Sequence, residues 1–237
     1  MRDPYLYEDI AVLKNKGNIR DAETLRAAEG DVTRLTMMLV YEQDFERFHT
    51  DTLREIHRII FEPLYDFAGE FRSIPIIKRE EVLGGDSVRY TRPEHIEAEL
   101  DAVAKEIALL PKLRDTKELL FRVTRITAKL WQIHPFREGN TRAVIAFSLL
   151  LLRHLKVEID YDLFREHAAY VRNSLVWASQ GMYAKFEYLE QIFFDAAGIL
   201  DDALDPAETK AADYSAVNGY AVANYREQPH SYDEEAE

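Results

Sequence analysis

The chain has 237 residues, of which 47% are hydrophobic, and it carries a formal net charge of −13. This length suits one large domain with appendages, and the apolar content suffices for a sizeable core. The sequence contains no cysteine, which excludes disulfides and thiolate metal sites. The negative charge argues against nucleic acid and anionic membranes as partners. Because the most apolar run, residues 143–152, is too short to span a bilayer, we expect a cytoplasmic protein, or one exported into a host cell by a route not visible in the sequence.

The N-terminal part divides into an arm and two helices. Residues 1–20 are expected to form an irregular arm, and the main domain is expected to cover 21–200. Residues 21–41 are predicted to form a helix with Asp21 as its cap. A second helix is expected within 47–73, where apolar residues recur at helical spacing: Leu53, Ile56, Ile60 and Leu64.

The character of the sequence changes over residues 73–92, which are rich in isoleucine, valine and tyrosine. The pair Gly84-Gly85 marks a turn in the middle of this segment. We therefore predict a short β-hairpin on an otherwise helical protein. The open edge of a hairpin can bind an extended peptide by strand addition.

The second half of the chain is predicted to be helical almost throughout. Pro93 opens a helix whose apolar face comprises Ile96, Leu100, Val103 and Ile107. Further helices are expected over 117–133, 142–155, 161–179 and 184–200, and the helix over 142–155 is apolar nearly all round, which indicates the buried centre of a bundle. The C-terminal extension, 201–237, is predicted to hold a weak helix over 207–225 and an acidic tail.

The stretch HPFREGNTR, residues 134–142, joins two of these helices and concentrates polar chemistry. Nine residues hold a base, an acid, an amide, two cations and a glycine. Gly139 permits a tight backbone there, and Asn140 and Thr141 are candidate caps for the helix that begins near Arg142.

The start of that helix offers unpaired N–H groups and a positive dipole, which make an anion site that Arg142 reinforces. Glu138 beside such a site would repel a phosphate unless a cation joined them. A Mg²⁺ ion that bridges Glu138 and phosphate oxygens resolves this conflict, and His134 is then the proton acceptor. The residues therefore predict Mg²⁺-dependent transfer of a phosphate-containing group.

The same stretch closely resembles the signature of the Fic (filamentation induced by cAMP) family, HPFx[D/E]GN-x-R. Upstream, a second set of residues resembles the family pattern Y-x-W-A-G-E-x-R, with phenylalanine in the tryptophan place: Tyr65, Phe67, Ala68, Gly69, Glu70 and Arg72. Fic proteins transfer AMP from ATP to a hydroxyl side chain of a target protein. The resemblance implies an all-α Fic-domain helical bundle with a small β-hairpin flap. We expect His57 to be structural and Glu70 and Arg72 to form a structural ion pair.

The resemblance also implies roles for individual residues. His134 deprotonates the Ser, Thr or Tyr hydroxyl of the target, and Glu138 binds Mg²⁺. Phe136 anchors the loop in the core, and the nucleotide site is formed by Phe136, Arg137, Gly139, Asn140, Thr141 and Arg142. The flap docks the target protein, with Ile76, Ile77 and Lys78 as the candidate contact residues.

The sequence departs from the family pattern at two positions. Thr141 replaces a glycine, and Ile145 replaces the second signature arginine, which in the family grips the γ-phosphate. Arg172, in a run that resembles the family's Y-x-R-(N/D)-(A/S)-L, is the candidate for a substitute phosphate contact. Two alternatives to AMP transfer stay open: Doc-like phosphotransfer or another nucleotide donor, and nucleotide or partner binding without turnover.

Many Fic proteins are inhibited by a helix with the pattern [S/T]-x-x-x-E-[G/N]. Glu29-Gly30 is the one Glu-Gly pair outside the signature, but Leu25 occupies the Ser/Thr position and Thr24 lies one residue early. Self-inhibition by this device is therefore not expected. A separate antitoxin-like protein is the alternative source of such a helix, although Ile145 removes the arginine that it would grip.

Overall fold

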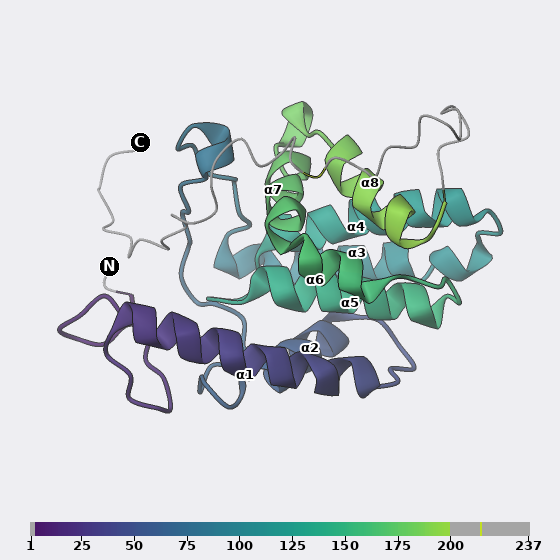
Figure 1. Cartoon of the computed structure of the whole chain (residues 1–237). Helices are drawn as coiled ribbons and strands as arrows, with labels where there is room; N and C mark the ends of the chain where they lie inside the picture. Colours follow the sequence, from purple (N-terminus) through teal and green to yellow (C-terminus); the bar gives the residue numbers. More distant parts are fainter. Residues whose placement is uncertain (1–2, 200–213, 215–237) are drawn as a thin grey trace.

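The computed structural model describes residues 3–199 and Tyr214, and these residues form a helical bundle (Figure 1). Its α-helices are α1 (Ala22–Glu42), α2 (Thr50–Phe61), α3 (Ile96–Ile107), α4 (Thr116–Ile133), α5 (Asn140–His154), α6 (Tyr161–Glu166), α7 (Ala168–Ala178) and α8 (Glu187–Ala196). Short 3₁₀ helices occupy η1 (Glu81–Leu83), η2 (Pro93–His95), η3 (Leu110–Lys112) and η4 (Gly181–Tyr183). The helix predicted over 207–225 lies outside the described residues apart from Tyr214.

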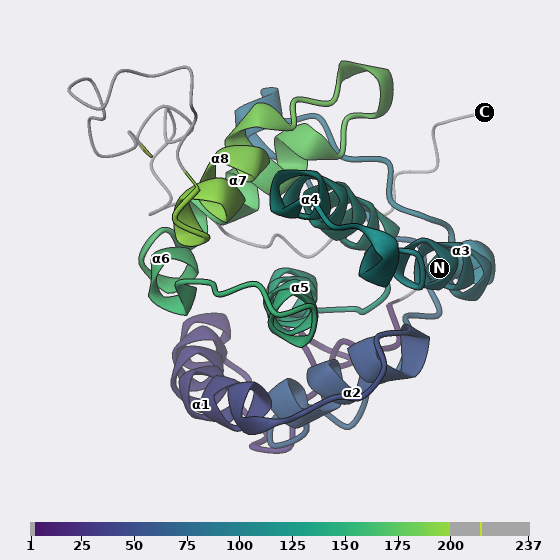
Figure 2. The ribbon, with the colours of Figure 1, turned by 90° about the vertical axis from the view of Figure 1, so that its right-hand side faces the viewer.

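Helix α5 is the centre of the bundle, as its all-round apolar sequence predicts. Figure 2 shows it end-on, with α1 and α2 on one side and α4 on the other. Its buried side chains point in every direction: Val144, Ile145, Ala146, Phe147, Leu149, Leu150, Leu151 and Leu152. Among the described residues, no helix combines the length and the apolar character needed to cross a membrane.

The helices at the N-terminal side form as the sequence predicts. The Asp21 side chain accepts a hydrogen bond from the backbone N–H of Thr24, which caps α1. Three of the predicted apolar residues of α2 are buried against the bundle: Leu53, Ile56 and Ile60. The whole predicted apolar face of α3 is buried as well.

The segment 73–92, here called the flap, folds back on itself but is not the predicted β-hairpin. The described residues contain no β-strand, and the flap contains one isolated antiparallel bridge, between Arg79 and Ser87. The buried guanidinium of Arg72 explains part of this difference, because it donates hydrogen bonds to the carbonyls of Ile74 and Thr91 near the two ends of the flap. Those carbonyls are then engaged by a side chain instead of by a strand ladder.

The helix predicted over 161–179 is divided into α6 and α7 at His167, whose backbone leaves the helical region at φ −110° and ψ 33°. The ring of His167 lies against that of Tyr214, with centroids 4.2 Å apart. No glycine or proline marks this break in the sequence. The break predicted near Gly181 is confirmed, since η4 separates α7 from α8 there.

Candidate active site

His134 ends helix α4 in the left-handed conformation, with φ 51° and ψ 59°. Histidine tolerates this region better than most residues, and the following Pro135 disfavours continuation of the helix. The Nδ1 atom of His134 lies 3.1 Å from the backbone oxygen of Trp131. Because a carbonyl oxygen only accepts, Nδ1 carries the proton in this contact and Nε2 carries the lone pair. Nε2 is therefore the nitrogen that can accept a proton from a substrate.

The imidazole of His134 is buried against two aromatic rings, which also contact each other, and the residue is 2% exposed. The Tyr90 ring lies over it with centroids 4.1 Å apart at 36°. The Trp131 ring meets it edge-on at 5.2 Å. These contacts restrict the orientation of the imidazole.

Asn140 closes the loop between α4 and α5 instead of capping α5. Its Oδ1 accepts from the N–H of Phe136 at 2.9 Å, and its Nδ2 donates to the carbonyl of the same residue at 2.8 Å. The predicted caps were therefore wrong: Gly139 occupies the N-cap position, and Thr141 Oγ1 accepts from Trp131 Nε1 at 2.9 Å. Because glycine offers no side-chain oxygen to the first N–H groups of α5, an anion can take that place.

Gly139 is required at its position for two reasons. Its φ of +76° is unfavourable for residues with a side chain. A Cβ atom built there would lie 2.1 Å from Cε2 and Cζ of Phe61, a wholly buried ring of α2. The loop and α2 can approach this closely only with glycine in the loop.

His57 of α2 contacts the same loop through a hydrogen bond and a ring contact. The N–H of Gly69 donates to His57 Nδ1 at 2.8 Å, so that Nε2 carries the proton and donates to the Glu138 carbonyl at 3.0 Å. Its ring stacks on the wholly buried Phe136 at 3.8 Å. Burial lowers the pKa of His57 to about 3. The predicted structural role is confirmed, with a neutral ring as the support.

Arg72 joins the loop to the flap. Its Nε donates to the His134 carbonyl at 2.7 Å, while its terminal nitrogens donate to the carbonyls of Ile74 and Thr91. The predicted ion pair with Glu70 was wrong, because Glu70 is exposed whereas Arg72 is 2% exposed and donates to backbone oxygens. One buried cation thus fixes the backbone of His134 and both ends of the flap.

Glu138 is buried at the start of α5, and its Oε1 accepts from the N–H of Gly139 at 2.7 Å. Among the described residues, no group of three or more His, Cys, Asp or Glu side chains could hold a metal ion. A single carboxylate fits a Mg²⁺ ion that is bound together with phosphate oxygens and water.

The arginine at the start of α5 is engaged by helix α1. The guanidinium of Arg142 forms an ion pair with Glu29 and donates to Thr33 Oγ1 at 3.0 Å. The Tyr65 hydroxyl donates to the other oxygen of Glu29. Burial, followed by the Glu29 carboxylate, raises the pKa of Tyr65, which therefore stays a donor. Sequence reasoning considered Glu29 only as part of an inhibitory motif that it rejected, and it missed the pairing of Glu29 with Arg142, although Glu29 and Thr33 share one face of α1 at helical spacing.

The other two predicted phosphate-binding arginines also have acidic partners. Arg137 forms an ion pair with Asp3 of the N-terminal arm at 2.8 Å, and both side chains are largely buried. Arg172 of α7 forms an ion pair with Glu80 of the flap at 2.7 Å. Arg142 lies in the first turn of α5, whereas the described contacts of Arg137 and Arg172 are with the arm and the flap.

The predicted target-docking residues of the flap differ in exposure. Ile76 is 8% exposed, whereas Ile77 is 56% exposed. The backbone N–H of Lys78 donates to Ser87 Oγ at 3.2 Å across the flap. Ile77 therefore presents the apolar side chain at this surface.

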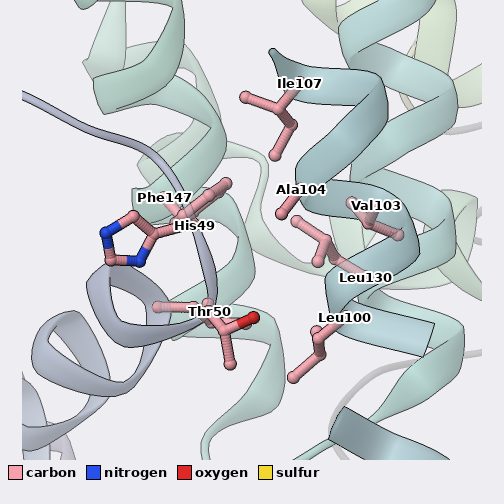
Figure 3. Close-up of a pocket in the computed structure, with 9 residues that line it drawn as sticks. His49, Thr50, Leu100, Val103, Ala104, Ile107, Leu130 and Phe147 are labelled. Atoms are coloured by element: carbon pink, nitrogen blue, oxygen red, sulfur yellow. The ribbon is translucent and has the colours of Figure 1, made fainter. Parts of the chain in front are cut away.

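A small apolar hollow lies between α2, α3, α4 and α5 (Figure 3). Its lining includes Leu53, Leu100, Val103, Leu130 and Phe147. All of its lining residues lie outside the 134–142 loop, and it offers little polar chemistry, so we interpret it as imperfect packing of the core.

Comparisons with known proteins agree with this geometry. The model of the Fic/DOC family matches residues 47–152. The probable protein adenylyltransferase y4lH of Sinorhizobium fredii is 31% identical over 166 residues, which are 68% of this chain and 80% of y4lH. The protein adenylyltransferase VbhT of Bartonella schoenbuchensis is 28% identical over 170 residues, 68% of this chain, but this chain spans only 33% of VbhT.

Solved structures share the fold. The BepC protein of Bartonella tribocorum with bound AMPPNP superimposes with a TM-score of 0.66 at 21% identity, over 81% of this chain and 95% of that one. A Fic domain from Bartonella quintana with bound ADP superimposes with a TM-score of 0.67 at 23% identity, over 81% of this chain and 93% of that one. The signature loop, the fold and the sequence relatives are those of Fic-domain proteins. The chain belongs to the Fic/DOC family.

Replacement of Gly139 by alanine should destabilise the protein more than replacement of Gly84, which also has a positive φ but no atom within 4 Å of an added Cβ. Gly84→Ala should lower the free energy of unfolding by roughly 1–2 kcal/mol, the penalty of the left-handed conformation. Gly139→Ala should lower the free energy of unfolding by the same amount and by a further 1–3 kcal/mol, roughly, because the added Cβ overlaps Phe61. Urea unfolding measures both values. Equal losses would mean that the contact with Phe61 is not tight.

The buried, neutral His57 should make the protein less stable in acid. An unfolded histidine binds a proton below about pH 6.5, but the folded one resists protonation until about pH 3. Between these values the unfolded chain therefore binds one more proton than the folded chain. As the pH is lowered through this range, the free energy of unfolding decreases by up to about 1.4 kcal/mol per pH unit.

Chemical unfolding between pH 7 and pH 4 tests this, with His57→Gln and the exposed control His95→Gln. The His57 variant should lose this part of the slope, and the His95 variant should keep it. An unchanged slope in His57→Gln would rule out a buried neutral histidine.

Proposed function

We propose that this chain transfers AMP from Mg·ATP to a Ser, Thr or Tyr hydroxyl of a target protein. His134 Nε2 takes the proton of the hydroxyl, the oxygen attacks the α-phosphorus, and pyrophosphate leaves. The observation that carries the proposal is the placement of His134 and the glycine-capped start of α5 at the two ends of one rigid loop. In-line displacement of this kind depends mainly on positioning and on neutralisation of charge.

The relatives support AMP as the transferred group, since several are named protein adenylyltransferases. The bound AMPPNP and ADP of two structural relatives support a nucleotide as the donor. Glu138 would hold Mg²⁺, which supplies charge neutralisation at the phosphates. Asn140 keeps the loop closed, and the first N–H groups of α5 would bind phosphate oxygens.

One observation favours a second candidate function, which is Doc-like transfer of a phosphate. Ile145 stands where the family has its second arginine, and it is packed into the core at 7% exposure. With Arg172 paired to Glu80, neither residue fixes the γ-phosphate in the described geometry. A different seating of the triphosphate would place the γ-phosphorus in line with the acceptor.

The target would dock through Ile77 on the flap, whose Tyr90 lies on the ring of the candidate base. The acidic net charge of −13 suits a basic target surface. An antitoxin-like protein stays a possible partner, but helix α1 of this chain already engages Arg142 through Glu29.

His134→Ala should abolish labelling of targets, with a loss of at least about 10²–10⁴-fold, the usual contribution of a general base. Cell lysate is incubated with ATP labelled at either the α- or the γ-phosphate, and the mass gained by the modified protein is measured. A gain of AMP from α-labelled ATP is expected. A gain of phosphate from γ-labelled ATP would favour the second candidate. His95→Ala, at an exposed site, should retain full activity, and equal labelling by the His134 variant would refute the role of His134.

Glu29→Gln should strengthen nucleotide binding. The Glu29 carboxylate neutralises Arg142 and would repel a phosphate at the start of α5. Its removal should lower the Kd for Mg·AMPPNP about tenfold, on the scale of one partly screened charge pair. Isothermal titration calorimetry measures this, with Glu23→Gln, an exposed carboxylate of the same helix, as the matched control. Unchanged affinity in the Glu29 variant would show that Arg142 does not contact the nucleotide.

A further inference from the structure

The flap carries a carboxylate that is completely buried. Glu80 is 0% exposed, and burial of an ionised carboxylate is unfavourable by several kcal/mol unless good partners satisfy it. Its Oε2 accepts from Arg172 of α7 at 2.7 Å, and its Oε1 accepts from the Tyr90 hydroxyl at 3.2 Å. Its backbone N–H donates to the Asp86 carbonyl at 2.9 Å, across the tip of the flap. Glu80 thus connects the two limbs of the flap to α7.

Tyr90 carries this connection to the candidate base. Its hydroxyl end is held by Glu80, and the face of its ring lies on the imidazole of His134 at 4.1 Å. Its ring also lies 5.8 Å from that of Trp131, which contacts the histidine as well. A continuous series of contacts therefore runs from Arg172 through Glu80 and Tyr90 to His134.

We propose that Tyr90 is a positioning residue that seats and covers the His134 imidazole, and that the buried Glu80–Arg172 pair holds Tyr90 in place. The catalytic meaning of this arrangement rests on the proposed function of His134. The covering itself rests only on the contacts described above.

The arrangement has a consequence for access to the site. The Tyr90 ring packs on the His134 imidazole, and the histidine is 2% exposed, so displacement of Tyr90 would uncover the face of the imidazole that it contacts. Movement of Tyr90 breaks its contact with Glu80, and removal of Arg172 leaves the Glu80 carboxylate buried with less compensation. The Glu80–Arg172 pair therefore sets how readily the base is uncovered. A target that binds the flap beside Ile77 would act on the same segment.

The rate at which diethyl pyrocarbonate modifies His134 in the folded protein reports this covering directly, by peptide mass spectrometry and without nucleotide or target. His134 should react slowly in the wild type, whereas the exposed His95 serves as the internal standard. Tyr90→Ala should increase the rate at His134 by up to about tenfold, the effect of removing one aromatic contact. Tyr90→Phe, Glu80→Gln and Arg172→Met should each increase it severalfold, since the ring stays but its support is lost.

The matched control is Arg165→Met, which removes an exposed arginine that pairs with carboxylates of its own helix. It should leave the rate at His134 unchanged. Tyr90→Phe keeps the ring, so it tests the proposal even if Tyr90→Ala fails to fold. Thermal unfolding of each variant establishes that the folded state is being measured.

Two outcomes would overturn the proposal. His134 could react as fast as His95 in the wild type, or it could stay protected in folded variants of Tyr90, Glu80 and Arg172. A wild type that protects His134 but transfers no AMP would refute the proposed function alone. If the positioning role of Tyr90 and the proposed AMP transfer are both correct, Tyr90→Phe should lower kcat, because the imidazole is less well oriented, and should leave the KM for ATP unchanged. A general loss of folding would not produce this pattern.

Discussion

The structure depends on buried side chains that donate hydrogen bonds to the backbone of the 134–142 loop. Arg72 donates to the His134 carbonyl, His57 to the Glu138 carbonyl, and Asn140 to the Phe136 carbonyl. A loop inside a bundle must satisfy such polar groups, because each one left unpaired would destabilise the fold. The same bonds fix where the imidazole and the start of α5 lie before any ligand binds, which is the preorganisation that in-line transfer requires.

The charges around this loop are already paired in the ligand-free protein. Arg142, Arg137 and Arg172 contact Glu29, Asp3 and Glu80 respectively. Such pairing limits the penalty of holding arginines in partly buried positions. On the proposed function, a phosphate at Arg142 would replace the Glu29 carboxylate, so nucleotide binding would exchange one anion for another. The ion pair with α1 would then oppose binding of the nucleotide.

The sequence predicted those features that local pattern determines. The all-round apolar run of α5, the Asp21 cap and the apolar face of α3 follow from residue spacing, and the family was evident from nine consecutive residues. Most failures involve contacts between distant segments. Arg72 donates to the carbonyls of Thr91 and His134, and Glu29 contacts Arg142 across 113 positions of sequence. The Asn140 failure is local, because its side chain bonds to the backbone of Phe136 instead of capping α5. No periodicity in a single sequence encodes these partners.

The central claim is that the loop is preformed and that the start of α5 receives the phosphates. A crystal structure with Mg²⁺ and AMPPNP tests it most directly. The account predicts an unchanged loop that keeps its bonds to Arg72 and His57, phosphate oxygens on the first N–H groups of α5, and Arg142 moved from Glu29 to a phosphate. A nucleotide bound elsewhere, or a loop rebuilt around it, would contradict the account.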